Sequence, residues 1–267
     1  MTSDWRSYDD IADRYDDVWA PRFVQVAEQI WGRVTPAPGS RILDVGTGTG
    51  IVPRVFRERG GRARLVVGCD RAEGMLRRAA DATPLLCPVR ADATSLPFVS
   101  GSFTVVTASF VLSHLPGYAI GLAEMHRVLV RGGTLAVSAW GPTDDPCSAL
   151  WHECLAAAIP KAEIDRALME VAPAEALFSN GHAMKTALRD AGFVHAAADA
   201  FVVEIDTDID SFMTDREMNS GGRYARSVLA PDRWAQFRAT TRLAFQNQFG
   251  SSFRYTRRAH VVTAMKA

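Results

Sequence analysis

Residues 41–50 read RILDVGTGTG, an apolar run that leads into an acid and three glycines at alternate positions. The run Arg41–Val45 predicts a strand, and the segment from Gly50 to Gly60 predicts the helix that follows it. Pro53 suits the first turn of that helix, where a missing N–H is tolerated. Alternate glycines let the backbone turn tightly and approach a ligand without side-chain collisions. The stretch therefore predicts a strand, a tight turn and a helix N-terminus that together can hold a nucleotide-like ligand.

Short apolar runs alternate with helical patterns through the rest of the first half of the chain. Strands are predicted at 65–70, near 85–89, at 103–108 and at 134–140, the last after a turn at Gly132-Gly133. Helices are predicted around Met75 and over 122–129. The strands are continuously apolar, which indicates burial on both faces and hence a parallel sheet with helices on each side. The predicted fold class is α/β, doubly wound.

Beyond Gly141-Pro142, helices with apolar stripes replace this alternation. One stripe ends at Pro160 and another follows Pro231, both at helical spacing. Their members are Trp151, Cys154, Leu155, Ala158 and Ile159, then Trp234, Phe237, Thr241, Ala244 and Phe245; an earlier stripe holds Phe23, Ala27, Ile30 and Trp31. Strands are expected at 201–205 and 258–265. We predict one domain over 1–267, with a core at about 35–141, 188–205 and 253–267 and a helical cap at 1–34, 142–187 and 206–250.

The composition excludes several classes of partner. Thirty basic and 30 acidic residues give a formal net charge of zero, so the chain lacks the basic surface of a sequence-independent nucleic-acid binder. No apolar run approaches the roughly 18 residues of a bilayer span, and Met1–Arg6 lacks signal-peptide features. The four cysteines and His152, His182 and His195 show no metal-ligand spacing. We expect a cytoplasmic protein with no metal, membrane or nucleic-acid partner.

All but three of the basic residues are arginine. We attribute this excess to the base composition of the genome rather than to chemistry.

The spacing of the glycines separates two classes of cofactor. A nicotinamide-binding turn has the pattern Gly-x-Gly-x-x-Gly, but counting from Gly46 the third glycine would fall on Ile51. Asp44, two residues before the first glycine, is also foreign to that pattern. Asp-x-Gly-x-Gly-x-Gly instead resembles the first motif of the class I S-adenosylmethionine-dependent methyltransferases. A glycine turn that only joins strand and helix, with Asp44 as a helix cap, is the alternative.

The resemblance implies a site for S-adenosylmethionine around this turn, with S-adenosylhomocysteine as product. That ligand carries a sulfonium and an ammonium group, so an acid beside the turn is favourable, as it would not be beside a pyrophosphate. The resemblance also implies a mostly parallel, Rossmann-like sheet of seven strands with an antiparallel last strand. The turn residues that it places at the cofactor are Asp44, Gly46, Thr47, Gly48 and Gly50.

Two further acids follow neighbouring strands. Asp70 ends the second strand, 20 residues after Gly50, where doubly wound nucleotide folds place an acid on the ribose hydroxyls. A helix cap is the alternative for Asp70. The sequence around it, with Arg71 and Met75, is similar to the family's second motif. Residues 90–98, RADATSLPF, resemble the segment that lines the adenine pocket, which implies this role for Asp92 and Ala93, a solvated loop acid being the alternative.

His114 is the candidate catalytic residue. It lies in SFVLSHLP, residues 109–116, just beyond the end of a strand. Ligands bind at this edge of an open α/β sheet, and imidazole titrates near neutrality, so His114 suits a general base. Similar methyltransferases use a histidine here, and the resemblance places Ser109 beside the cofactor. A histidine that only shapes the pocket wall is the alternative.

The N-terminal segment with Tyr8 and Tyr15 resembles the helix that closes over the cofactor in relatives, where the Tyr15 phenol could meet the cofactor's carboxylate. Packing of both rings against the sheet is the alternative. A further set of large side chains predicts an apolar roof over the acceptor, with fewer than about half of them touching it. These residues are Trp140, Trp151, Phe178, Met184, Met213, Met218 and Phe245.

The resemblance covers about Tyr8–Trp140 and, more loosely, the Gly192-Phe193 segment and the last strand. It is greatest to the ubiquinone/menaquinone-biosynthesis-like branch. Thr104 departs from the family pattern, which has an acid after Phe103, so no role of that acid is carried over.

We predict an enzyme that transfers a methyl group from S-adenosylmethionine to a small, largely apolar or aromatic molecule, in secondary-metabolite or cofactor biosynthesis. The acceptor atom (oxygen, nitrogen or carbon) stays open, and the protein is expected to be a monomer or homodimer. Three alternatives remain: an enzyme of the same fold that catalyses a non-methylating reaction such as cyclisation, a silent cofactor-binding partner protein, and a nicotinamide dehydrogenase. The mass of the product separates methylation from cyclisation.

Overall fold

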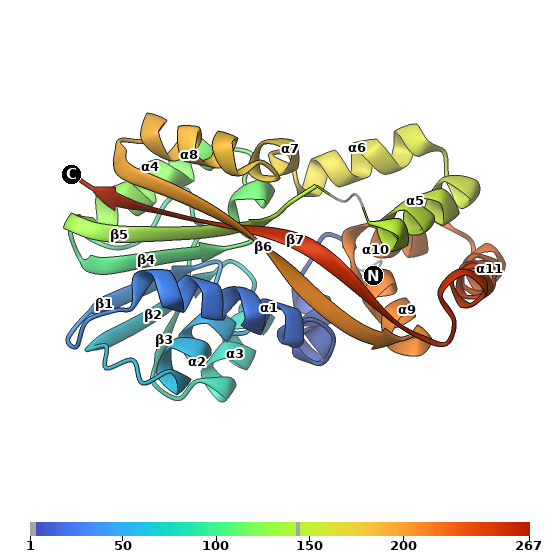
Figure 1. The fold of residues 1–267 in the computed structure, drawn as a ribbon, viewed down its shortest axis with the longest axis horizontal. Coiled ribbons are helices and arrows are strands. Elements are labelled where there is room, and N and C mark those ends of the chain that lie inside the picture. The colour runs from blue at the N-terminus through green and yellow to red at the C-terminus, as the bar shows by residue number, and fades with distance from the viewer. Residues whose placement is uncertain (1–3, 143–144) are drawn as a thin grey trace.

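The computed structural model describes residues 4–142 and 145–267. Figure 1 shows a twisted sheet with helices on both faces, and a second group of helices beyond one end of the strands. Residues 1–3 and 143–144 lie outside the described residues. The sequence analysis assigns both segments to the cap, and residues 1–3 also belong to the Met1–Arg6 segment.

Helices and strands alternate through the first half, as the sequence predicts. The strands are β1 (Arg41–Val45), β2 (Leu65–Asp70), β3 (Leu86–Arg90), β4 (Phe103–Ser109), β5 (Leu129–Trp140), β6 (Phe193–Asp208) and β7 (Ser252–Lys266). The α-helices are α1 (Ala12–Val34), α2 (Ile51–Glu58), α3 (Glu73–Ala82), α4 (Tyr118–Val128), α5 (Pro146–Ala158), α6 (Lys161–Val171), α7 (Glu175–Phe178), α8 (Gly181–Asp190), α9 (Ile209–Met218), α10 (Ser220–Val228) and α11 (Pro231–Phe249). Short 3₁₀ turns are η1 (Asp9–Ile11) and η2 (Leu112–His114).

The seven strands form one sheet in the order β3-β2-β1-β4-β5-β7-β6. β1 to β5 are parallel, and β7 runs antiparallel to both β5 and β6. The predicted doubly wound, mostly parallel sheet with an antiparallel last strand is therefore confirmed. The order reverses at β1, so the carboxyl ends of β1, β2 and β4 meet at the switch point where such folds bind ligands.

β5 begins earlier than the sequence predicts. Gly132-Gly133 reads as a turn, yet both glycines lie within the strand, which starts at Leu129. The register with β4 shifts between the pairs Phe103↔Leu129 and Val105↔Thr134, so the extra residues form an irregularity in the ladder. Gly132 has φ +73°, a conformation that glycine tolerates, which explains how the strand can pass through the pair without ending.

β6 and β7 are much longer than the predicted 201–205 and 258–265, because they continue past the sheet as a two-stranded arm. Their pairing extends to Asp208↔Ser252, and α9, α10 and α11 are inserted between those two residues. In Figure 1 this arm reaches from the sheet to the cap helices α5, α9, α10 and α11. The arm therefore connects the cap to the sheet.

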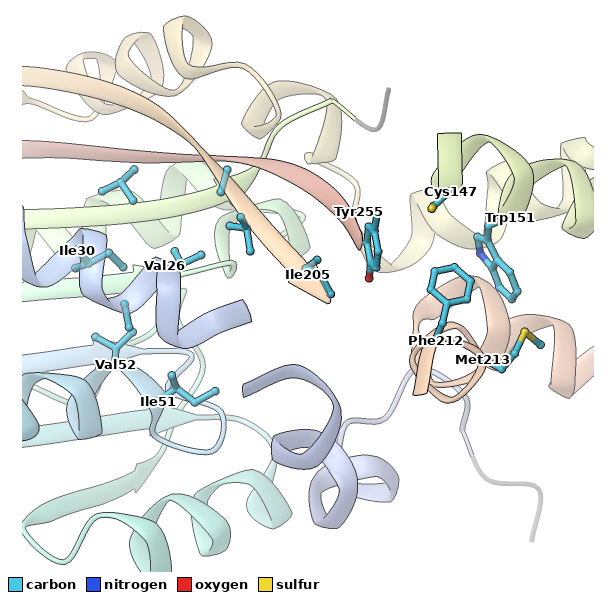
Figure 2. Packing of buried hydrophobic residues seen from close by; sticks show 14 of the residues in the cluster. Val26, Ile30, Ile51, Val52, Cys147, Trp151, Ile205, Phe212, Met213 and Tyr255 are labelled. Carbon is cyan, nitrogen blue, oxygen red and sulfur yellow. The ribbon is translucent and has the colours of Figure 1, made fainter. Parts of the chain in front are cut away.

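The core has two layers, one on each face of the sheet. Leu43, Val106 and Leu135 are fully buried on the face covered by α4 and α8, and the other face packs against α1 and α2. Figure 2 shows Val26, Ile30, Ile51 and Val52 on that second face, and Cys147, Trp151, Phe212 and Met213 within the cap. Tyr255 of β7 lies between the two groups, with its ring 5.8 Å from that of Phe212. Hydrophobic burial is thus continuous from the sheet into the cap.

Among the described helices, none is both long enough and apolar enough to pass through a bilayer.

Candidate functional site

A cavity of about 1320 Å³ lies between the carboxyl ends of the parallel strands and the cap. Its walls come from the ends of β1, β2 and β4 and from α1, α5, α6, α9 and α10. A pocket for one small ligand measures roughly 300–1,000 Å³, so this cavity has room for two ligands side by side.

The glycine turn after β1 forms part of the floor of this cavity. Gly46 has φ +65° and Gly48 φ +53°, in the left-handed region that favours glycine. A Cβ on Gly46 would lie 2.2 Å from a methyl carbon of Val111, whereas a Cβ on Gly48 would meet nothing within 4 Å. The turn therefore leaves its backbone open to the cavity at Gly48 and tolerates no side chain at Gly46.

Gly50 has a different position from the other glycines of the turn. It has φ +81° and caps α2, and a Cβ there would lie 3.2 Å from Cβ of Ala79. Unlike Gly46, Thr47 and Gly48, it is not among the residues that line the cavity. Its requirement for glycine comes from the packing of α2 on α3.

Asp44 is buried beneath the turn and accepts a hydrogen bond of 2.6 Å from the Thr107 hydroxyl. Burial raises the pKa of its carboxyl to about 6, against the opposing effect of that hydrogen bond. A carboxylate with this pKa is ionised at neutral pH, and it faces the cavity. Asp44 therefore supplies a buried negative charge beside the open backbone of Gly48.

Asp70 at the end of β2 fixes the turn from the other side. Its carboxylate accepts hydrogen bonds from the backbone N–H of Gly48 at 3.0 Å and of Ala72 at 2.9 Å. Burial raises its pKa, although these backbone N–H groups oppose the shift. Both the helix-cap alternative and a ligand role are compatible with this position, since the group also lines the cavity.

Asp92 and Ala93 follow β3 and also line the cavity. The Asp92 carboxylate accepts from the Thr94 backbone N–H at 2.8 Å and from the Thr94 hydroxyl at 2.6 Å, and both bonds lower its pKa. The remaining predicted residues Arg71, Met75 and Ser109 also line the cavity, with Met75 buried and the Ser109 hydroxyl 2.8 Å from that of Ser138.

His114 ends η2 and lines the cavity. Its Nδ1 lies 2.7 Å from the backbone carbonyl oxygen of Val171, the last residue of α6. A carbonyl can only accept, so Nδ1 carries the proton and Nε2 keeps a lone pair. The arrangement fixes the tautomer that a general base needs.

The tyrosines of the N-terminal segment also line the cavity. The Tyr15 ring lies edge-on to Trp19 at 4.7 Å between centroids and 6.4 Å from the Tyr8 ring, which in turn lies 6.3 Å from the His114 ring. Burial raises the pKa of Tyr15 well above its usual value and also raises that of Tyr8. Both phenols are therefore neutral hydrogen-bond donors at physiological pH.

Of the side chains predicted for the apolar roof, Trp140 and Trp151 line the cavity. The other five are buried elsewhere, so they belong to the core: Phe178, Met184, Met213, Met218 and Phe245. Phe23 and Phe110, which the sequence analysis does not assign to the acceptor site, complete an aromatic wall with Trp140. The centroid distances are 5.0 Å between the phenylalanines and 4.5 Å from Phe110 to Trp140.

Four arginines at the cavity have no counterpart among the predicted site residues. They are Arg22 of α1, Arg216 of α9, Arg223 of α10 and Arg257 of β7. They lie far apart in the sequence, and no local pattern distinguishes them from the other arginines of the chain. His152, expected at the surface or in packing, is exposed and borders the same cavity. Within the described part of the chain, no group of three metal-ligating side chains gathers at any point.

Comparison with known proteins identifies the class to which this site belongs. The model of a methyltransferase domain family matches residues 43–137. The demethylmenaquinone methyltransferase of Renibacterium salmoninarum is 34% identical over 165 residues, which are 57% of this chain and 68% of that protein. The chain belongs to the class I S-adenosylmethionine-dependent methyltransferases. The predicted resemblance is thus confirmed, and S-adenosylmethionine is the cofactor of the class.

A second relative shows how far the likeness extends. The demethylmenaquinone methyltransferase of Beutenbergia cavernae is 37% identical over 153 residues, 54% of this methyltransferase and 61% of the relative. The aligned part therefore spans about three fifths of that relative's length.

Solved structures share the fold of this methyltransferase. A phosphoethanolamine N-methyltransferase of Haemonchus contortus in complex with S-adenosylhomocysteine has a TM-score of 0.60 at 14% identity, covering 98% of this chain and 58% of the other. The 4+2 cyclase SpnF has a TM-score of 0.56 at 20% identity, covering 91% and 81%. The same fold thus hosts methylation and cyclisation, so fold alone does not decide the reaction.

Proposed function

We propose that this methyltransferase transfers a methyl group from S-adenosylmethionine to a small acceptor with an aromatic or apolar body. The observation that supports this most is that one cavity is lined by the glycine turn with its acids and also by His114 and the aromatic wall. Its volume of about 1320 Å³ allows cofactor and acceptor to lie in contact. Alignment of two reactants in a water-poor site can contribute roughly 7–11 kcal/mol to lowering a barrier.

The chain's residues suit the cofactor in charge and shape. The open backbone at Gly48 and the carboxylate of Asp44 suit its amino-acid end, and the neutral Tyr15 phenol can donate to its carboxylate. Asp70 can accept from the ribose hydroxyls, while Asp92 and the Ala93 N–H can meet the adenine. When bound, S-adenosylmethionine supplies an electrophilic methyl group with a good leaving group, so the protein mainly has to bind, orient and exclude water.

His114 removes the proton of an acceptor that has to lose one, such as a phenol, alcohol or amine. The Val171 carbonyl holds the Nδ1 proton, so the free Nε2 lone pair receives the acceptor's proton. The Tyr8 ring lies edge-on to the imidazole, with 6.3 Å between the ring centroids. The same geometry orients the base and links it to α6 of the cap.

The product mass tests the proposal. The protein is incubated with S-adenosylmethionine and a panel of small aromatic acceptors, and the products are examined by mass spectrometry. A gain of one methyl group together with formation of S-adenosylhomocysteine supports methyl transfer. Conversion of an acceptor to an isomer without S-adenosylhomocysteine would instead support the cyclisation alternative. Cofactor binding without any turnover over the whole panel would support a silent binding protein.

A further inference from the structure

The charged residues of the cavity divide into two groups by position. Three acids lie on the cofactor side together with Arg71: Asp44 near the end of β1, Asp70 at the end of β2 and Asp92 just beyond β3. Four arginines, from α1, α9, α10 and the arm of β7, lie on the side of the cap together with Lys161, and the acids on that side are Asp165, Glu175 and the buried Asp215. The acceptor end therefore carries an excess of positive charge inside a chain of zero net charge.

Arg257 lies over the aromatic wall. Its guanidinium carbon is 4.3 Å from the centroid of the Trp140 ring, which holds the group flat against the indole. Among the described residues it has neither a hydrogen-bond partner nor an ion-pair partner within 4 Å. Burial, and to a smaller extent the charge of Arg216, lower its pKa to about 10, so Arg257 stays charged at neutral pH next to a second cation.

Arg216 is buried, with 7% of its surface exposed. Its Nε makes no hydrogen bond with any described residue, and its distance to the Asp215 carboxylate is 3.7 Å, longer than a hydrogen bond. The guanidinium lies over the Phe212 ring at 4.7 Å. A buried, unsatisfied guanidinium is costly unless a partner completes it.

The nearby carboxylates do not supply that partner. Asp215 is already bound by Arg22 at 3.0 Å and by the indole N–H of Trp19. Glu175, whose charge also acts on Arg257, is exposed and beyond 4 Å. Arg223 is held by the Ser7 carbonyl and lies over the Tyr8 ring. Arg216 forms an ion pair with Asp215 but no hydrogen bond to it, so Arg257 and the Nε of Arg216 keep hydrogen-bond donors without a partner among the described residues.

We infer that the methyl acceptor is an aromatic carboxylic acid, whose carboxylate is bound by Arg257 and Arg216 while its ring packs on Phe23, Phe110 and Trp140. Planar guanidinium groups match carboxylates, and an aromatic ring can pack on the aromatic wall beside Arg257 while its carboxylate meets the guanidinium. The inference rests on the proposed function, because it names the acceptor class of that same reaction. The sequence predicts an acceptor with an apolar or aromatic body, and the inference adds a carboxylate group to that body.

The test compares acids with their uncharged amides on the protein saturated with S-adenosylhomocysteine. The probe pairs are benzoate and benzamide, salicylate and salicylamide, and 2-naphthoate and 2-naphthamide, titrated calorimetrically. We expect at least one acid to bind about 10-fold or more tightly than its amide. Arg257→Met is expected to remove this preference and Arg257→Lys to restore part of it. Arg216→Met is also expected to remove the preference for the acid, independently of Arg257.

Arg258→Met is the matched control. Arg258 is the next residue of β7, so its side chain points to the opposite face of the strand, and it is exposed. This variant should keep the acid preference, and all four variants should keep their affinity for S-adenosylhomocysteine, which also shows that they fold. Equal binding of acid and amide in every pair, no binding of either, or a preference that survives both methionine variants overturns the inference. Failure of the wild type to bind S-adenosylhomocysteine would instead contradict the proposed function.

Discussion

Nδ1 of His114 lies 2.7 Å from the carbonyl oxygen of Val171, and this contact joins the sheet to the cap. His114 follows β4 through η2, while Val171 ends α6. The orientation of the proposed base therefore depends on the position of a cap helix 57 residues further along the chain. The cap helix α6 thus fixes one ring nitrogen of the proposed base.

His114→Ala should separate binding from turnover. We expect normal affinity for S-adenosylhomocysteine and a turnover about 100-fold slower or more, because general bases contribute roughly 10²- to 10⁴-fold. Single-turnover kinetics measure the effect, with an acceptor that the wild type methylates. His182→Ala, at an exposed position of α8, is the control and should leave turnover unchanged. Turnover near that of the wild type would leave His114 only a place in the cavity wall.

Asp44 should make cofactor affinity depend on pH. Burial raises its pKa to about 6, so the negative charge that we propose attracts the cofactor's ammonium group is lost as the pH falls through that value. We expect affinity for S-adenosylhomocysteine to be constant above about pH 7 and to fall by up to about tenfold per pH unit below 6. Asp44→Asn should bind more weakly at neutral pH, with a flatter profile in calorimetric titrations.

The effect of Asp44→Asn on stability is expected to be opposite to its effect on cofactor affinity. The folded-state pKa of Asp44 is raised above the ordinary value of 3.8, so its contribution to stability is greatest below that pH and is lost as the pH rises through about 6. Asp44→Asn is therefore expected to melt at or above the wild-type temperature at pH 7. Asp81→Asn, on the exposed side of α3, serves as control for both measurements. A variant that binds weakly only because it is unfolded would disprove the electrostatic role.

Gly46→Ala should be more damaging than an alanine at another left-handed glycine. Positive φ alone costs about 1–2 kcal/mol for a non-glycine residue, and the new Cβ at Gly46 would lie 2.2 Å from Val111. Overpacking adds roughly 1–3 kcal/mol. Gly39→Ala, at φ +84° with open space around it, is the control and should show the strain alone. Chemical denaturation measures the difference, and equal losses in the two variants would contradict the close approach seen here.

Asp215→Asn should loosen the cap. Asp215 is 3% exposed and binds Arg22 at 3.0 Å; burial raises its pKa, but the charges of Arg22 and Arg216 outweigh burial and leave the pKa lowered. Removing this charge leaves Arg22 without its partner, so we expect a loss of about 3 kcal/mol in the free energy of unfolding.

That loss should be present at neutral pH and shrink on acidification, because a lowered folded-state pKa stabilises only while the group is ionised. Asp199→Asn, which removes the exposed partner of Arg33, should change stability little. If both variants had the same small effect, the Asp215 cluster would not hold the cap in place.

The sheet and the cofactor side of the cavity were predictable from the sequence because their signals are local. The strand, turn and helix at 41–58 follow from adjacent residues, and Asp44, Asp70 and Asp92 each stand at the end of a strand. In a parallel sheet those ends meet at one edge, so a linear pattern specifies a three-dimensional cluster. Gly50 shows the limit of this reasoning, since a shared motif does not reveal which of its glycines face the ligand.

The residues on the acceptor side of the cavity could not be predicted from the sequence in the same way. Arg216 and Arg257 are brought together by the long β6–β7 arm, whose length beyond the sheet has no separate signal in the sequence. The abundance of arginine, which we attributed to base composition, also hides the few that are buried. Burial and pairing distinguish them, and both are properties of the folded chain.

The most direct test of the central claim is a calorimetric titration of ligand-free protein with S-adenosylhomocysteine. The account predicts saturable binding at one site per chain, lost in Gly46→Ala and weakened in Asp44→Asn. Absence of heat with both S-adenosylhomocysteine and S-adenosylmethionine, from a protein that is folded by circular dichroism, would contradict it.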